Sequence, residues 1–201
     1  MKSIIGITGG IASGKSFVCT ILKEQGFSVI DADEISRELS KRGNPLYEKI
    51  IECFGKEYVN FDGELDRKSF GKMIFENEDE RRKLNDISHP LIVEEMRKRI
   101  DKDSSPILFL DIPLLFEAKL SYLCDKIVCV YVNQATQIER LRKRDGISKA
   151  YALQKINAQI PLEQKKAMSD YIIESKESFE DTRQETLKTI KKIMEDTYVN
   201  D

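Results

Sequence analysis

The segment Gly9–Ser16 carries the clearest chemistry of the chain, because it reads GGIASGKS and matches the pattern GxxxxGK[ST]. In this pattern, glycine amides converge on phosphate oxygens, the lysine places a positive charge beside the outer phosphates, and the serine hydroxyl can bind Mg²⁺. The apolar run Ile4–Ile7 precedes the segment, and Val18, Ile21 and Leu22 follow it with helical spacing. A strand, a phosphate loop and a helix in this order indicate binding of a nucleoside triphosphate.

Two carboxylates, Asp31 and Asp33, follow the second apolar run, Phe27–Ile30. Ligands of open α/β sheets bind beyond the carboxyl ends of the strands, so we expect these side chains near the phosphate loop. One of them could accept the proton of a hydroxyl that attacks the γ-phosphate, or could hold Mg²⁺. The alternative is structural, with an aspartate capping the helix expected over Glu34–Leu39.

Asp111 follows the apolar run Ile107–Leu110, at the position where many phosphate-loop proteins keep an acid that directs Mg²⁺. The next segment, Ile112–Glu117, contains Pro113 and then Leu114 and Leu115. It could line a substrate, or it could return apolar side chains to the core. The residues by themselves leave both interpretations open.

Arg140 and Arg144 are spaced to share one face of a helix expected over Gln137–Arg144. Phosphoryl transfer spreads negative charge over the γ-phosphate, and arginines on a mobile element can close over it and exclude water. We favour this function for the pair. The alternative is a surface helix whose arginines pair with Glu139 and Asp145.

His89 is the single histidine and precedes Pro90, with no partner nucleophile marked nearby. A capping or packing role is therefore favoured over catalysis, and contact with a substrate is the alternative. Zinc binding is poorly supported because the cysteines contain no CxxC pair, and reduced, mostly buried thiols are expected. The cysteines are Cys19, Cys53, Cys124 and Cys129.

Apolar runs separated by helical stretches predict a doubly wound α/β fold with a parallel sheet, because strands buried on both faces read as continuous apolar runs. Between the second and third runs, a long insert shows helical spacing over Pro45–Phe54, Asp66–Phe75 and Asp79–Ile100. A further helix is expected over Phe179–Met194. The expected strands are Ile4–Ile7, Phe27–Ile30, Ile107–Leu110, Ile127–Val132 and Tyr171–Ile173.

The 201 residues suit one core with an elaboration. Thirty-three basic and 35 acidic residues give a net charge of −2, so no basic field favours nucleic acid or a membrane as partner. No window reads as a membrane span or a signal segment, and we expect a cytoplasmic protein that is a monomer or a small homo-oligomer.

Several segments together make the chain resemble dephospho-CoA kinase, a family of P-loop kinases. The order and spacing of the segments carry the resemblance over nearly the whole chain. The segments are TGGIASGKS at 8–16, VIDAD at 29–33, HPLI at 89–92, PLLFE at 113–117, Arg140, Arg144 with Asp145, INAQ at 156–159 and DYII at 170–173.

The resemblance implies phosphorylation of the ribose 3′-hydroxyl of dephospho-CoA by ATP with Mg²⁺, the last step of coenzyme A synthesis. It implies a single P-loop kinase unit over 1–201, with a five-stranded parallel nucleotide-binding core at 1–32 and 105–201. A helical CoA-binding insert at 33–104 and an arginine-rich lid at 137–160 complete that fold. A kinase acting on another nucleoside or nucleotide hydroxyl is the alternative, and a nucleotide-binding module without chemistry is a third interpretation.

The resemblance also implies roles for individual residues. Asp33 is implied as the general base, with Lys15 and Arg140 as the other catalytic residues and Ser16 on the metal. The implied ATP-binding positions are Gly9, Gly10, Ile11, Ala12, Ser13, Gly14, Lys15, Ser16, Phe17 and Arg144. The implied substrate-binding positions are Thr8, Asp31, His89, Leu114 and Leu115.

The chain departs from the family pattern at a few positions. The family commonly has Gly at the position of Ala12 and often has Thr at the position of Phe17. Since alanine is comfortable only at negative φ, we predict an ordinary backbone conformation at Ala12. Glu174 follows the last strand, where the family often has an asparagine near the base, so selectivity for adenine is less well supported than catalysis.

Overall fold

The computed structural model describes residues 2–198. It divides into two compact units, an α/β unit of residues 1–30 and 103–201 and a helical unit of residues 31–102. The boundaries that the sequence suggests, at 33 and 104, differ from this division by two residues at each end. The assignment of the helical unit to CoA stays a prediction.

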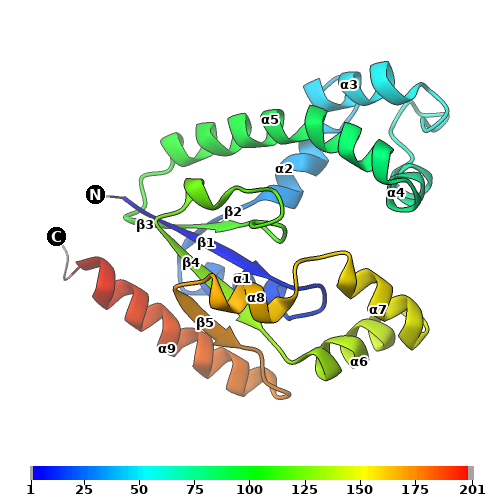
Figure 1. The fold of residues 1–201 in the computed structure, drawn as a ribbon. Helices are drawn as coiled ribbons and strands as arrows, with labels where there is room; N and C mark the ends of the chain where they lie inside the picture. The colour runs from blue at the N-terminus through cyan, green and yellow to red at the C-terminus, as the bar shows by residue number, and fades with distance from the viewer. Residues whose placement is uncertain (1, 199–201) are drawn as a thin grey trace. The chain divides into compact units, whose positions relative to one another are not determined.

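The α/β unit is built on a five-stranded sheet in the order β2-β3-β1-β4-β5, which confirms the predicted fold class (Figure 1). The register pairs Ile7 of β1 with Asp111 of β3, so the carboxyl ends of these two parallel strands meet at one edge. Each predicted apolar run forms a strand. The strands are β1 (Ser3–Gly9), β2 (Ser28–Asp31), β3 (Ile107–Asp111), β4 (Lys126–Tyr131) and β5 (Tyr171–Glu174).

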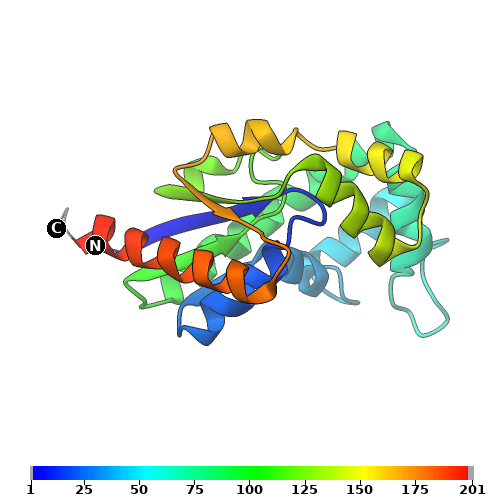
Figure 2. The ribbon, with the colours of Figure 1, turned by 90° about the horizontal axis from the view of Figure 1, so that it is seen from below.

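Helices cover both faces of this sheet, as the continuous apolar runs predict (Figure 2). On one face, Val128 and Val130 of β4 pack in a core cluster with α1 (Lys15–Glu24) and α9 (Phe179–Tyr198). On the other face, Cys129 packs with Leu162 of α8. The remaining elements of the unit are η1 (Ser121–Leu123), α6 (Gln134–Asp145), α7 (Lys149–Asn157) and α8 (Leu162–Ala167).

The helical unit contains four helices around an apolar cluster that includes Leu46, Ile50 and Phe70. Asp66 caps the third of these helices, since its side chain accepts hydrogen bonds from the amides of Lys68 and Ser69 at 3.1 Å each. The insert is helical, as predicted. Its helices are α2 (Ala32–Leu39), α3 (Pro45–Phe54), α4 (Arg67–Glu76) and α5 (Glu78–Lys102).

Candidate active site

The phosphate loop joins the buried end of β1 to the first turn of α1. Gly14 has φ 95°, a left-handed conformation that favours glycine, and it precedes α1 without a side-chain cap. The turn is closed by the Ser13 amide, which donates to the Gly10 carbonyl at 3.1 Å. A Cβ on Gly14 would lie 2.7 Å from the Ser175 Oγ, so a side chain would not fit there. No side chain of the described residues therefore accepts from the first-turn amides of α1, so these amides are available to bind an anion.

Ser13 is 1% exposed, and its Oγ has no hydrogen-bond partner among residues 2–198. A buried hydroxyl without a partner is costly, so the loop contains a donor for which the described part of the chain supplies no acceptor. Gly9, the first glycine of the pattern, is buried beside it, because a Cβ on Gly9 would lie 2.6 Å from that Oγ. These features fit a loop that closes around phosphate oxygens.

Lys15 forms an ion pair with Asp111, and the Sγ of Cys19 lies 3.2 Å from the second carboxylate oxygen of Asp111. Asp111 is 5% exposed and ends β3, next to β1. The structure therefore brings together the predicted phosphate-binding lysine and the predicted metal-directing acid. Ser16, the next residue after Lys15, is exposed. A serine hydroxyl and a carboxylate are hard oxygen donors of the kind that Mg²⁺ takes.

Ala12 has φ 59°, so the prediction of an ordinary negative φ was wrong. A left-handed residue with a Cβ costs roughly 1–2 kcal/mol. The surroundings hold it there, because Ile11 and Ala12 pack against the cluster of Leu141, Ala152 and Ile156 in α6 and α7. The sequence rule for alanine treated the loop as isolated, whereas these contacts fix its backbone.

The backbone of Ile11 is engaged on both sides by glutamines. The Oε1 of Gln159 accepts from the Ile11 amide at 3.0 Å, and the Nε2 of Gln137 donates to the Ile11 carbonyl at 2.7 Å. Phe17, further along the loop, contacts the ring of Phe179 edge-on, with centroids 5.0 Å apart.

Thr8 is fully buried, and its hydroxyl donates to the Pro113 carbonyl at 3.0 Å. The same carbonyl accepts from the Nζ of Lys165 at 3.1 Å, and Lys165 also lies 2.8 Å from the Oε1 of Glu117. Lys165 is itself fully buried and lies 3.4 Å from the Gly9 carbonyl. The Thr8 side chain therefore ties the loop entrance to the turn after Asp111.

The turn at residues 112–117 resolves one open alternative for Leu115. Leu115 is fully buried, and a Cβ on Gly6 of β1 would lie 3.3 Å from its Cδ2, so this side chain packs back on the core. Leu114 is 44% exposed. Of the two predicted substrate-binding leucines, Leu114 presents its side chain to solvent.

Arg140 reaches the loop that follows β5. Its Nη1 donates to the Ser175 Oγ at 2.7 Å and its Nη2 to the Lys176 carbonyl at 2.6 Å. The Nη1 atom would also lie 3.6 Å from a Cβ built on Gly14, which places the guanidinium beside the phosphate loop. Arg140 thus contacts Ser175 and Lys176 beside the phosphate loop, and its role in catalysis stays a prediction.

Arg144 instead pairs with its neighbour Asp145, through an Nε to Oδ1 distance of 2.7 Å. Lys155 joins the same carboxylate at 3.1 Å. Hydrogen bonds from Arg144 and Lys155 lower the pKa of Asp145 to about 2. The pairing of Arg144 with Asp145 corresponds to the surface alternative, and its role toward a nucleotide stays a prediction.

In the helical unit, Asp31 caps α2, since its Oδ1 accepts from the amides of Asp33 and Glu34 at 2.8 and 3.0 Å. Asp33 is exposed in the first turn of α2. His89 lies half-buried inside α5, where burial lowers its pKa while nearby Asp86 acts in the opposite direction. The capping alternative therefore holds for Asp31, and Asp33 is the member of the pair that the cap leaves at the surface.

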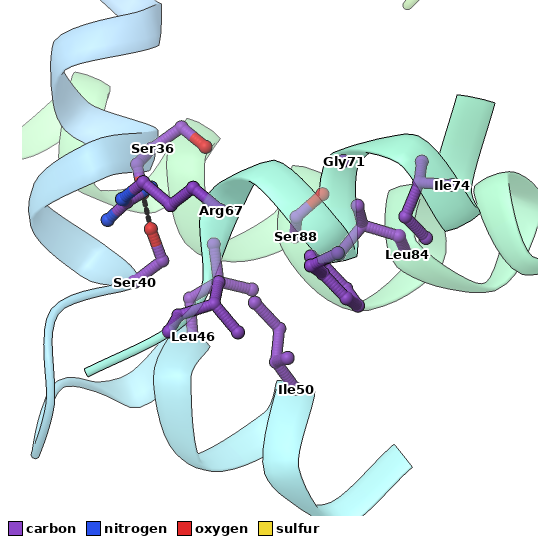
Figure 3. Close-up of a pocket in the computed structure, with 11 residues that line it drawn as sticks. Ser36, Ser40, Leu46, Ile50, Arg67, Gly71, Ile74, Leu84 and Ser88 are labelled. Atoms are coloured by element: carbon purple, nitrogen blue, oxygen red, sulfur yellow. Dashed lines mark hydrogen bonds between the residues drawn. The ribbon is translucent and has the colours of Figure 1, made fainter. Parts of the chain in front are cut away.

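The helical unit also contains a mostly apolar cavity of about 180 Å³ (Figure 3). Ser40 borders it and donates to the Ser36 carbonyl at 2.6 Å. The lining residues come from all four helices and from the segment before α4. They are Ser36, Ser40, Leu46, Ile50, Leu65, Arg67, Phe70, Gly71, Ile74, Leu84 and Ser88.

Sequence reasoning missed the polar groups that hold the phosphate loop from behind. Lys165 is one of three charged residues in a short polar helix, and only the i, i+3 spacing from buried Leu162 places it on the inner face. Gln137 and Gln159 carry no charge and belong to no phosphate-binding pattern. Gln159 ends the INAQ segment at 156–159, which contributes to the family resemblance but assigns it no role, and Gln137 carries no comparable signal.

Comparisons with known proteins give the relatives of this chain. A family model described as dephospho-CoA kinase matches residues 3–181. The dephospho-CoA kinase of Carboxydothermus hydrogenoformans is 47% identical over 192 residues, which cover 94% of this chain and 93% of that one. The structure of dephospho-CoA kinase from Campylobacter jejuni superposes with a TM-score of 0.70 at 30% identity, covering 96% and 98% of the two chains. Protein TT1252 of Thermus thermophilus gives a TM-score of 0.81 at 28% identity, covering 94% and 96%.

Proposed function

We propose how catalysis is divided among the residues of this chain, which belongs to the dephospho-CoA kinase family. Its activity is that of a dephospho-CoA kinase, which catalyses the final step of coenzyme A biosynthesis. The family uses ATP. The ribose 3′-hydroxyl attacks the γ-phosphorus of ATP in line, the bond to the β-γ bridging oxygen breaks, and ADP leaves. The observation that carries the proposal is the Lys15–Asp111 pair, next to Ser16, in a loop that leads into the uncapped start of α1.

The phosphate loop binds the triphosphate of ATP through the amides at the start of α1. Lys15 then exchanges its contact with Asp111 for the outer phosphates, where its positive charge offsets the charge that builds during transfer. Ser16 and Asp111 are the residues that would hold Mg²⁺, which supplies neutralisation of phosphate charge when bound. The buried Ser13 hydroxyl gains an acceptor when phosphate oxygens enter the loop.

Asp33 is the general base in this proposal. It is exposed at the start of α2, directly beyond the carboxyl end of β2, where substrates of α/β sheets bind. Its neighbour Asp31 is occupied as the helix cap. Asp33 accepts the proton of the 3′-hydroxyl as the new bond to phosphorus forms.

Arg140 stabilises the transition state. Its guanidinium already lies beside Gly14, held by Ser175 and the Lys176 carbonyl. Because it lies beside the phosphate loop, Arg140 is better placed for the role than Arg144, which pairs with Asp145.

The apolar cavity of the helical unit accommodates part of the aliphatic arm of dephospho-CoA. Its volume of about 180 Å³ is too small for a nucleotide, while its walls of leucine, isoleucine and phenylalanine suit methyl and methylene groups. Ser88 lies on its wall and is 6% exposed. Ser88→Leu should therefore raise the KM for dephospho-CoA and leave the KM for ATP unchanged.

The test incubates the purified protein with ATP, Mg²⁺ and dephospho-CoA, and follows ADP and coenzyme A together. Adenosine and AMP are supplied separately as rival acceptors. Coenzyme A formed in step with ADP, with neither rival phosphorylated at a comparable rate, supports the proposal. ADP formed only with a rival acceptor would instead favour a kinase for another nucleoside or nucleotide hydroxyl.

A further inference from the structure

One residue of the phosphate loop, Ile11, has both of its backbone polar atoms bound by side chains from outside the loop. The Gln159 Oε1 accepts from its amide at 3.0 Å, and the Gln137 Nε2 donates to its carbonyl at 2.7 Å. An amide N–H requires an oxygen acceptor and a carbonyl requires an N–H donor, so each glutamine has a fixed orientation. The two contacts therefore have opposite polarity.

The contacts are built into the packing. Gln137 is 3% exposed, and a Cβ on Gly10 would lie 2.6 Å from its Nε2, so the side chain reaches Ile11 only because residue 10 is glycine. The Ile11 side chain itself packs in the cluster formed by α6 and α7. Because the Ile11 peptide groups are already fixed, they lose little conformational entropy when a ligand binds.

The two glutamines come from the two ends of the α6–α7 helical pair. Gln137 lies in the first turn of α6, and Gln159 follows the end of α7. Arg140, one turn after Gln137 on α6, lies beside Gly14 at the other end of the loop. The pair of helices therefore contacts the phosphate loop at both Ile11 and Gly14.

We propose that Gln137 and Gln159 are positioning residues that set the direction of the Ile11 and Ala12 peptide groups for ATP. In a trans peptide, the carbonyl and the following N–H point in opposite directions. Holding the Ile11 carbonyl toward Gln137 therefore turns the Ala12 amide away from α6, and the left-handed φ of Ala12 is the backbone conformation that results. The Ile11 amide, already bound by Gln159, serves the loop rather than the ligand. The proposal rests on the assignment of the loop to the phosphates of ATP.

The opposite polarity of the two contacts gives a matched test. Gln159→Glu keeps an oxygen that accepts from the Ile11 amide, so its kcat/KM for ATP should stay within about twofold of the unmodified protein. Gln159→Leu removes the acceptor and should lower that value about tenfold, mainly through a higher KM for ATP. Gln164→Glu, an exposed change on α8, is the control for added charge.

Substitution by Glu should be harmful at Gln137, whereas it should be tolerated at Gln159. A carboxylate there would face the Ile11 carbonyl, so Gln137→Glu should lose about tenfold or more in kcat/KM for ATP at about pH 9. Burial at this position, where Gln137 is 3% exposed, should raise the pKa of the introduced carboxyl group. Relative to the unmodified protein at each pH, activity should therefore recover toward about pH 6, where the protonated group can donate to that carbonyl. Gln137→Leu should be impaired at every pH and decides the question if Gln137→Glu does not fold.

Equal losses in Gln159→Glu and Gln159→Leu, with unchanged melting temperatures, would overturn the proposal, as would a Gln137→Glu/unmodified ratio that does not vary with pH. Lys15→Ala serves as a second reference in the same assays. If Lys15→Ala leaves the KM for ATP and kcat unchanged, the assignment of the loop to ATP fails. If only the glutamine variants are unaffected, the loop assignment stands and the positioning proposal fails.

Discussion

The α/β unit and the helical unit differ in how many polar side chains they bury. Among the described residues, the α/β unit buries several beside the phosphate loop, including Thr8, Asp111 and Lys165. The helical unit keeps its charges at the surface, as in the Lys98–Glu94 pair, whose side chains are 56% and 62% exposed. Its buried polar residues are two serines, Ser40 and Ser88.

This difference indicates which unit holds its functional groups in a fixed geometry. Burying a charge or a hydroxyl is costly unless it is paired, so a unit that buries many of them gains fixed geometry rather than extra stability. The phosphate loop has that geometry imposed on it from behind. In the helical unit, burial of apolar side chains forms the core, and its cavity depends on shape more than on polar contacts.

Within the α/β unit, the largest effect should come from Lys15. Lys15→Ala removes the charge that meets the outer phosphates and leaves Asp111 buried without its partner. We expect kcat/KM for ATP to fall by about 10²–10³. Steady-state kinetics with varied ATP measures this, with the exposed Lys23→Ala as control. A change of less than twofold in Lys15→Ala would remove the loop from the catalytic site.

A matched pair of lysines compares the two units directly. Lys165→Met removes one partner of a buried ion pair and two further contacts to carbonyls, and should lower the free energy of unfolding by about 3 kcal/mol. Lys98→Met removes a surface pair and should give no measurable change. Urea denaturation of both variants measures the difference. Equal losses would show that the buried pair has no special structural role.

Gly71 offers a smaller and opposite effect in the helical unit. It lies within α4, and a Cβ built there has no atom within 4 Å. Gly71→Ala should raise the free energy of unfolding by about 0.5–1 kcal/mol, because alanine loses less backbone entropy in a helix. Thermal and urea unfolding measure this. Destabilisation instead would mean that the α4 backbone at Gly71 is not ordinary helix.

The smallest effect concerns Asp145, an exposed carboxylate in the α/β unit whose pKa is lowered to about 2 by Arg144 and Lys155. A lowered folded-state pKa contributes stability above the unfolded value of about 3.9, and that stability is lost as pH falls toward 2. Because the group is exposed, Asp145→Asn should cost less than about 1 kcal/mol at neutral pH, and the gap to the unmodified protein should close in acid. Unfolding curves of both proteins at neutral pH and at about pH 2 test the direction of this pH dependence.

The sheet and the phosphate loop could be predicted from the sequence because their signals are local. Continuous apolar runs marked each strand, and Gly9, Lys15 and Ser16 occur at fixed spacing. Helix ends were placed well where a capping residue marks them, as at Asp66 before α4. These features depend on neighbouring residues in the chain.

The surroundings of the loop could not be predicted, because they depend on residues distant in the sequence. Gln159 is 148 positions from the amide that it binds, and Lys165 is 156 positions from Gly9. Ala12 likewise packs against residues of α6 and α7 that are distant in the sequence, and its left-handed φ contradicted the intrinsic preference of alanine. Asp31 shows the same limit, since a carboxylate after a strand fits both a cap and a catalytic site until its hydrogen bonds are known.

The most direct test of the proposed division of catalysis is the turnover of Asp33→Asn beside that of Glu34→Gln, the next exposed carboxylate of α2. Coenzyme A formation is measured with saturating ATP and dephospho-CoA, and ATP affinity is measured by calorimetry on the same preparations. Asp33→Asn should lower kcat by about 10²–10⁴ and leave ATP affinity unchanged, while Glu34→Gln turns over at nearly the unmodified rate. Normal turnover in Asp33→Asn would contradict its assignment as the base that receives the proton of the 3′-hydroxyl.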